Sequence, residues 1–163
     1  MVKLHTIGGK ANTSFGIYAG KGLIERTGWE NGDSLRITAV DDDLILVTPE
    51  QMPPEQWTAL YNVATALKTI NEMSPAELVT LLDISEGEDG RRPSSVTSLA
   101  PLGASGHRIV VTNAVHRLNL STGGNILRRV GMDVVVLIPE DRETESVKQR
   151  ARDVLNVREG QVG

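Results

Sequence analysis

Hydrophobic and polar residues in the first 50 positions follow the pattern of short strands around one short helix. The segment SLRITAV (34–40) alternates apolar and polar residues, and LILVT (44–48) is an unbroken apolar run. The acidic turn Asp41-Asp42-Asp43 separates the two segments, and Pro49 follows the second. Because such runs joined by a short polar turn are typical of β-hairpins, we predict a hairpin that Pro49 closes.

A helical period replaces this pattern in residues 53–84. One apolar stripe recurs at helical spacing and comprises Trp57, Leu60, Tyr61, Ala64 and Leu67. Farther along, Ser74, Pro75 and Glu77 form a capping box with proline at the first helical position, which predicts a second helix through Leu82. We therefore expect a helical hairpin over 53–84, inserted between two other parts of the chain.

The remaining pattern predicts a linker and then a second mixed region. Residues 85–106, SEGEDGRRPSSVTSLAPLGASG, are polar and rich in Gly, Ser and Pro, which favours a flexible linker or long loop. Residues 107–163 resume with a strand at RIVVT, a short helix near GNILRRVG, a buried strand at DVVVLIP and a charged helix from Glu140. One face of that last helix carries Val147, Ala151, Val154 and Leu155.

An internal repeat is suggested when the chain is aligned with itself at an offset of 103 positions. FGIYAGKGLIERTG (15–28) then falls on LNLSTGGNILRRVG (118–131), with Gly20 on Gly123 and Arg26 on Arg129. With three residues of the first copy omitted, DSLRI (33–37) falls on DVVVL (133–137). Repeats of this size bury apolar faces against each other, so we expect residues 107–138 to form a degenerate second copy.

The glycine-rich stretch FGIYAGKGLIERTGWENGD (15–33) invites comparison with a phosphate-binding loop. A Walker loop here would need Gly at position 15 and Ser or Thr at position 22, where the chain has Phe15 and Gly22. The GxGxxG fingerprint is also absent from this stretch. The spacing therefore argues against nucleotide binding at this point.

A different family matches the same stretch in order and without a gap. From Asn12, the sequence has an apolar-Gly-apolar strand (15–17), a short helix from Gly22 to Thr27, Gly28 where the helix ends, the turn Gly32-Asp33 and two strands around DDD. Over about residues 3–50 the chain resembles the swapped-hairpin DNA-binding domain of MazE-type antitoxins and AbrB/SpoVT-type regulators.

The resemblance implies an α+β fold built on a small swapped-hairpin β-barrel. In that family two chains interlock their hairpins to complete one barrel. Here the second copy at 107–138 could supply the partner half, which would make the chain a single-chain pseudo-dimer with a helical insertion, or the first copy could dimerise with another chain. The second copy has no obvious equivalent of LILVTPE (44–50).

Two positions depart from the family pattern. Gly20 replaces the proline of the turn before the helix, and Tyr18 replaces a basic residue that commonly precedes it. The N-terminal strand, which lies on DNA in the family, offers only Lys3, His5 and Lys10. Since phosphate neutralisation supplies much of the affinity for DNA, these departures weaken the implied DNA contact.

Charge is unevenly distributed along the 163 residues, whose formal net charge is −4. Only residues 104–163 lean basic, with nine Lys or Arg against seven Asp or Glu, so DNA binding would need a local patch. The candidate DNA-binding residues are Lys3, His5, Lys10, Asn12, Lys21, Arg108, His116, Arg117, Arg128 and Arg129. The alternatives are solvated surface residues and, for Asn12, a turn that its side chain caps.

Other chemistry finds little support in the sequence. The chain has no cysteine, and its histidines (His5, His107, His116) lack the spacing of metal ligands, so we expect neither a metal site nor a cofactor. No Ser lies in a GxSxG context, and we do not expect an enzyme. The apolar runs are short and the N-terminus lacks a signal-like apolar core, which suggests a cytoplasmic protein without a membrane segment.

The sequence therefore leads to two hypotheses of different classes. The first is a transcriptional regulator that binds duplex DNA through basic residues of the barrel and forms a homo-oligomer, most simply a dimer. The second is a protein-interaction module, antitoxin-like or a viral accessory protein, that keeps the barrel but has lost DNA binding. Tyr18, Gly20 and the net negative charge of residues 1–50 favour the second.

Overall fold

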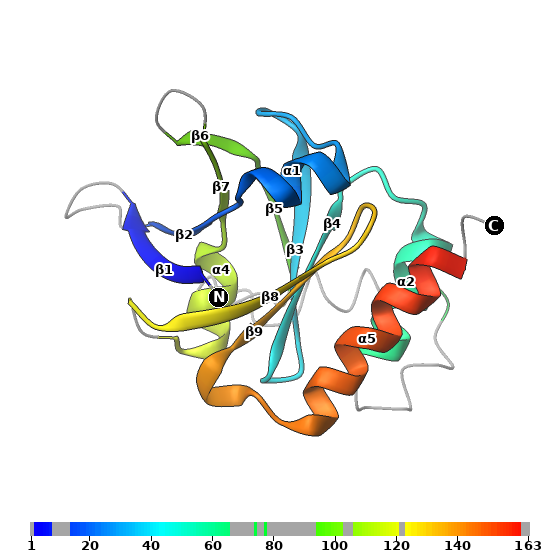
Figure 1. Ribbon diagram of the computed structural model, residues 1–163. Coiled ribbons are helices and arrows are strands. Elements are labelled where there is room, and N and C mark those ends of the chain that lie inside the picture. Colours follow the sequence, from blue (N-terminus) through cyan, green and yellow to red (C-terminus); the bar gives the residue numbers. More distant parts are fainter. Residues whose placement is uncertain are drawn as a thin grey trace.

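The computed structural model describes residues 2–7, 14–65, 74, 77, 94–102, 106–120 and 123–160. One antiparallel sheet of nine strands dominates this part of the chain (Figure 1). The strands are β1 (Val2–Ile7), β2 (Ser14–Tyr18), β3 (Ser34–Val40), β4 (Leu44–Pro49), β5 (Ser94–Ser98), β6 (Ala100–Leu102), β7 (Gly106–Val110), β8 (Asn125–Val130) and β9 (Val135–Pro139). The described helices are α1 (Lys21–Thr27), α2 (Pro54–Ala64), α4 (Thr112–Leu118), the short 3₁₀ helix η2 (Glu140–Arg142) and α5 (Glu145–Gly160).

The sheet curls into a nearly closed barrel. Its strand order is β5-β3-β4-β9-β8-β1-β2-β7-β6, and the two end strands, β5 and β6, follow one another along the chain with only Leu99 between them. The backbone N–H of Leu99 donates to the carbonyl of Asp33 (2.9 Å), and its carbonyl accepts from Gly32 (2.8 Å). One bent stretch of chain therefore joins both ends of the sheet and leaves few backbone groups without partners there.

Strands β4 and β9 are buried on both faces, which explains their unbroken apolar sequences. Ile45 and Val47 point into the barrel, whereas Leu44 and Leu46 belong to a second cluster outside it. Strand β9 alternates in the same way, with Leu137 inside. Because successive side chains point to opposite faces, a strand between two apolar layers needs hydrophobic residues at every position.

The helices serve these two clusters differently. Helices α1 and α4 add Leu23, Val115 and Leu118 to the barrel interior. Helices α2 and α5 pack together over the outer cluster through Trp57, Val154 and their neighbours. Figure 1 shows α2 and α5 on one side of the barrel and strands β1, β2, β6 and β7 on the other.

Most of the predicted local elements are confirmed. The hairpin around Asp41-Asp42-Asp43 forms, and strand β4 ends at Pro49 as expected. Helix α1 stops at Gly28, whose φ of 73° is the left-handed conformation that glycine adopts freely. The helix with the Trp57 stripe spans Pro54–Ala64, and the apolar face of the last helix packs inward.

The same order of elements occurs twice. Strand, short helix, two hairpin strands and helix appear as β2-α1-β3-β4-α2 and again as β7-α4-β8-β9-α5. The left-handed C-caps Gly28 and Asn119 are 91 residues apart, as are the positive-φ glycines Gly32 and Gly123. The internal repeat is therefore structural, with an offset near 91.

The offset of 103 predicted from sequence is wrong. It placed β2 and α1 over a segment that holds the end of α4 and strand β8, and GNILRRVG is a strand rather than a short helix. The structure instead aligns DLILVTPE (43–50) with DVVVLIPE (133–140), 90 residues apart. The second copy therefore has an equivalent of LILVTPE, contrary to expectation.

The linker prediction for 85–106 is also wrong over its described part. Residues 94–98 and 100–102 form β5 and β6, and β5 pairs along β3 from Ser34↔Ser98 to Thr38↔Ser94. Serine- and proline-rich composition concealed these strands because their stability comes from β3 and β7. Of the second predicted helix, Ser74 and Glu77 are described, and the N–H of Glu77 donates to Oγ of Ser74 (3.2 Å), as a capping box requires. The rest of that helix lies outside the described residues.

Within the described part of the chain, none of the helices combines the length and the apolar character needed to cross a bilayer.

Candidate nucleic-acid interface

The outer surface of β1, β2, β7 and β6, which we term the open face, has no described helix over it. Leu4, Ile17 and Ile109 from these strands point into the barrel and are buried. Their neighbours Tyr18 and Arg108 therefore point outward, on the side opposite α2 and α5. The open face is the part of the barrel wall where strand side chains meet solvent rather than a helix.

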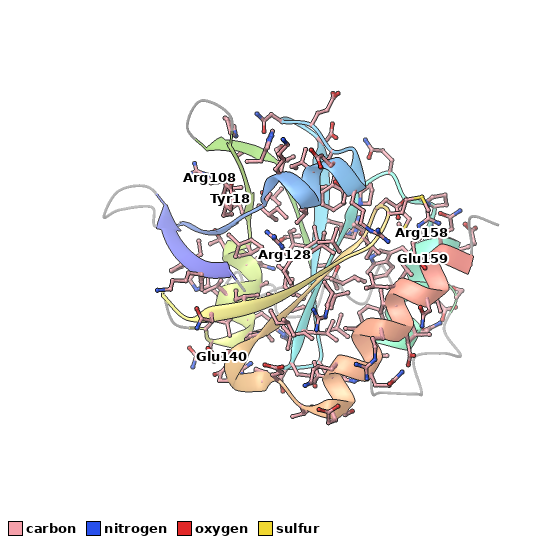
Figure 2. All side chains as sticks on the ribbon, in the orientation of Figure 1. Tyr18, Arg108, Arg128, Glu140, Arg158 and Glu159 are labelled. Atoms are coloured by element: carbon pink, nitrogen blue, oxygen red, sulfur yellow. The ribbon has the colours of Figure 1, made fainter. Side chains whose placement is uncertain are left out.

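A row of cationic and aromatic side chains crosses this face. Tyr18 on β2 and Arg108 on β7 are direct cross-strand partners, and Figure 2 shows them side by side. Leu4 pairs with Ile17, so one step further along both strands Lys3 lies beside Tyr18. Tyr18 is 44% exposed and Lys3 is also exposed. We call Lys3, Tyr18 and Arg108 the basic row.

Arg108 is the half-buried member of this row. Its Nε atom is buried, and among the described residues no acceptor bonds it. Because this unused donor is buried, Arg108 contributes to the open face through its positive charge rather than through Nε.

The next row across the same strands consists of His5, Gly16 and Val110 and contains neither lysine nor arginine. Gly16 pairs with Val110, and His5 of β1 pairs with Gly16. Apart from His5, whose side chain lies outside the described part, these residues bring no titratable group to the surface. The positive charge of the open face is therefore concentrated at one end of β2 and β7.

A hollow of about 520 Å³ adjoins the basic row at the start of α1. We term it the first hollow, and its lining residues are Tyr18, Gly20, Lys21, Ile24, Glu25 and His107. Lys21 is 88% exposed and lies 3.8 Å from the carboxylate of Glu25. An exposed pair of this kind contributes little to stability, so Lys21 is free to turn toward another anion.

Arg128 lies behind two lining residues of the first hollow, Tyr18 and Gly20. Its Nη1 atom donates to the carbonyls of Tyr18 (2.9 Å) and Ala19 (2.7 Å), which fixes the bend between β2 and α1. A Cβ atom on Gly20 would lie 3.1 Å from Nη2 of Arg128. Burial lowers the pKa of Arg128, and the nearby Tyr18 partly raises it again. Among the described residues no carboxylate forms an ion pair with this guanidinium.

His107 forms the opposite wall of the first hollow. Its Nδ1 atom lies 2.7 Å from Oδ1 of Asn31 and donates to it, which fixes the orientation of the ring. Asn31 belongs to the turn before β3, so this bond ties β7 to the first half of the chain.

A second hollow, of about 250 Å³, lies at the other end of the open face beside α4. It is lined by residues of β5, Val110 and the first turns of α4, with His116 at its edge. Val96 on β5 is 48% exposed, and the ring of His116 stands edge-on to Phe15 at 5.7 Å. This second hollow is lined by apolar, hydroxyl and amide groups and the imidazole of His116, without a lysine or arginine.

A third hollow, about 450 Å³, lies away from the open face between Leu4, Gly124 and η2. Glu140 and Asp141 border it, and Glu140 accepts from Nδ2 of Asn125 (2.9 Å). These exposed carboxylates would repel a phosphate, so we do not include this hollow in the interface.

Three of the ten candidate residues meet around Tyr18: Lys3, Arg108 and Lys21. His116 lies at the second hollow. Lys10 and Asn12 lie outside the described residues, as does the side chain of His5.

The other candidates lie elsewhere. Arg128 bonds the backbone of Tyr18 and Ala19. Arg129 pairs with Val136, a residue of the helix-covered cluster. The charge of Arg117 acts on the phenol of Tyr61 in that same cluster. The pKa of Tyr61 is raised to about 12, mainly by burial and also by Asp41, and Arg117 opposes this shift.

Sequence reasoning missed two residues of this site. Tyr18 was interpreted only as the loss of a basic residue, yet it is the centre of the basic row. His107 was considered only as a metal ligand, and it lines the first hollow. The signal that would have revealed both is the pairing of β2 with β7, which becomes visible once DLILVTPE is aligned with DVVVLIPE.

Comparison with known proteins gives no further guidance to this site. No protein-family model, no curated protein and no solved structure matches the chain.

Proposed function

We propose that this protein is a DNA-binding transcriptional regulator of the AbrB/MazE type, and that the open face is the surface that meets the duplex. The observation that carries this proposal is the basic row of Lys3, Tyr18 and Arg108, which continues into Lys21 on a barrel wall without a described helix over it. Cations gathered on one uncovered surface supply the phosphate contacts on which most DNA affinity depends.

The fold supports the same proposal. Each half of the chain contributes a hairpin, β3–β4 or β8–β9, and the inner strands of the two hairpins pair through Leu46↔Val136. The halves also pair through β2 and β7 around Ile17↔Ile109. This exchange of strands is what a swapped-hairpin dimer would look like if both copies were joined in one chain. The barrel would then need no second chain for its closure.

The chemistry expected at this surface is backbone recognition. Lys3, Lys21 and Arg108 would each neutralise a phosphate, and the Tyr18 hydroxyl would donate to a further phosphate oxygen. Three neutralised phosphates correspond to a slope of about −3 in a plot of log K against log salt concentration.

The test is fluorescence anisotropy of the intact protein with a random-sequence duplex, titrated from about 50 mM to about 200 mM salt. The test variant carries Lys3→Gln, Lys21→Gln and Arg108→Gln. The matched control carries Arg129→Gln, Lys148→Gln and Arg152→Gln, which changes the net charge equally on other surfaces. We expect the test variant to lose most of the affinity and of the salt slope, and the control to keep both. Equal losses in the two variants would show that the open face is not the contact surface.

A second candidate function is a protein-interaction module on the same barrel. The observation that favours it is the exposure of two large apolar side chains, Tyr18 on the open face beside the first hollow and Val96 on β5 beside the second. Exposed aromatic and aliphatic groups are typical of protein interfaces. Absence of duplex binding by the wild-type protein at low salt would favour this second function.

A further inference from the structure

The two hollows beside the open face occupy equivalent places in the two halves of the chain. The central pair Ile17↔Ile109 relates Tyr18 to Val110, because each is the next residue along its strand. The first residues of α1 and α4 are Lys21 and Thr112, so four residues later Glu25 corresponds to His116. Tyr18, Lys21 and Glu25 line the first hollow, and their counterparts line the second.

The chemistry of these equivalent places is not equivalent. The first hollow is lined by the exposed ammonium of Lys21, the carboxylate of Glu25 and the phenol of Tyr18, and the Arg128 guanidinium lies close to Gly20. The second hollow has Val110 in place of Tyr18 and Thr112 in place of Lys21. The hydroxyl of Thr112 accepts from the N–H of Phe15 (3.0 Å) and carries no charge, so it does not replace the ammonium of Lys21.

We infer that the first hollow binds a backbone phosphate of the DNA and that the second does not. Of the two equivalent places on the barrel, only one then makes a charged contact with the duplex. This inference rests on the proposed function and adds the direction in which the protein holds the duplex. A symmetric dimer would present two identical hollows, whereas in this chain one hollow is lined by Lys21 and Glu25 and the other has no lysine, arginine or carboxylate in its lining.

The phosphate assignment follows from the groups that border the first hollow. Lys21 supplies a mobile point charge, and the Tyr18 hydroxyl supplies a donor from the adjoining strand. Arg128 adds positive charge behind Gly20, and no described carboxylate is paired with it. Glu25 is the one opposing group on the lining, and at 65% exposure it can turn toward solvent when a phosphate enters.

The experiment compares single variants at equivalent and remote positions by the same anisotropy titration. Lys21→Gln removes the cation of the first hollow, and His116→Gln changes the second hollow at the position equivalent to Glu25. Lys148→Gln, on α5, is the matched lysine control. We expect Lys21→Gln to weaken binding and to reduce the salt slope by about one, and the other two variants to leave the slope unchanged.

Glu25→Gln is expected to change the duplex affinity in the direction opposite to Lys21→Gln. Removing this carboxylate leaves Lys21 without a competitor for the phosphate, so we expect tighter duplex binding and no change in fold by circular dichroism. The three side chains Lys21, Glu25 and His116 are exposed, so their replacement leaves the core intact.

The outcomes separate this inference from the proposed function. A wild-type protein that fails to bind duplex at low salt overturns both. The second outcome is a wild-type protein that binds duplex with a steep salt slope. If Lys21→Gln and His116→Gln then weaken binding equally, or if neither weakens it, the assignment of a phosphate to the first hollow alone is overturned and DNA binding still stands.

Discussion

Arg128 holds the bend between β2 and α1 by donating to two consecutive carbonyls, those of Tyr18 and Ala19. The guanidinium can approach this closely because Gly20 has no side chain, and the φ of 77° at Gly20 is a conformation that other residues adopt only with strain. The position of Tyr18 on the open face, and of Lys21 after it, therefore depends on a glycine and an arginine 108 residues apart in the sequence.

At this scale we predict that Gly20→Ala destabilises the protein by about 1–2 kcal/mol, because alanine is strained at positive φ and its Cβ crowds Arg128. The matched control is Gly22→Ala, at the second residue of α1, where a Cβ meets open space and φ is not positive. That variant should gain up to about 1 kcal/mol from higher helix propensity. Urea unfolding measures both, and destabilisation of the same size in both variants would contradict this account.

Helix α5 forms ion pairs with both hairpins of the barrel, β3–β4 and β8–β9. Arg150 forms ion pairs with Asp41 and Asp43 in the β3–β4 turn and also donates to the carbonyl of Ala64 at the end of α2 (3.0 Å). Two turns later, Arg158 makes a two-pronged contact with Asp133 before β9. Asp43 and Asp133 are equivalent residues of the repeat, and a single helix binds both.

For the element scale we predict that Arg150→Met lowers the free energy of unfolding by about 2–3 kcal/mol. The three charged side chains are mostly buried, with Arg150 12% exposed, so removing the cation leaves two carboxylates poorly solvated. Arg152→Met, on the exposed side of the same helix, should change stability by less than about 0.5 kcal/mol.

Chemical denaturation would measure the coupling between Arg150 and the two aspartates. The proteins compared are Arg150→Met, Arg152→Met, the double variant Asp41→Asn with Asp43→Asn, and the triple variant that adds Arg150→Met to that double variant. The two Asp→Asn substitutions should restore part of the free energy of unfolding that Arg150→Met removes, and they should lower it when Arg150 is present. If the effects of these substitutions on the free energy of unfolding are additive, the ion pairs of Arg150 with Asp41 and Asp43 do not stabilise the protein as a network.

Strands from both halves of the chain alternate around the barrel. Strand β3 lies between β4 of its own half and β5 of the other, and β4 lies between β3 and β9. Each half keeps its own hairpin pairings but loses strand neighbours when the other half is absent, and the interior cluster draws residues from both. Stability is therefore expected to be a property of the intact chain rather than of either repeat.

At the scale of the molecule we predict that a fragment of residues 1–65 is unfolded alone at low concentration and folds when mixed with a fragment of residues 94–163. Far-ultraviolet circular dichroism and proton chemical-shift dispersion would report folding. A 1–65 fragment that forms a stable homodimer, and does not associate with the second fragment, would show that the first repeat carries a complete barrel and would contradict closure within one chain.

The sequence by itself determined the local elements of this protein. Alternation and acidic residues defined the β3–β4 hairpin, Gly28 defined the end of α1, and apolar stripes defined α2 and α5, because turns, caps and amphipathic faces depend on residues within a few positions of one another. It also indicated an α+β chain with an internal repeat and named Lys3, Lys21 and Arg108 among the candidate cations.

Only the tertiary structure decided the register of the repeat, the two strands within the serine-rich segment and the side chains that meet on the open face. Strands β5 and β6 exist because β3 and β7 supply their hydrogen bonds, so their own composition carries little signal. Arg128 and Arg129 differ by one position, yet one binds the bend before α1 and the other points outward, since adjacent strand residues face opposite sides. Tyr18 and Arg108 are distant in sequence and become neighbours through the pairing of β2 with β7, which no local pattern encodes.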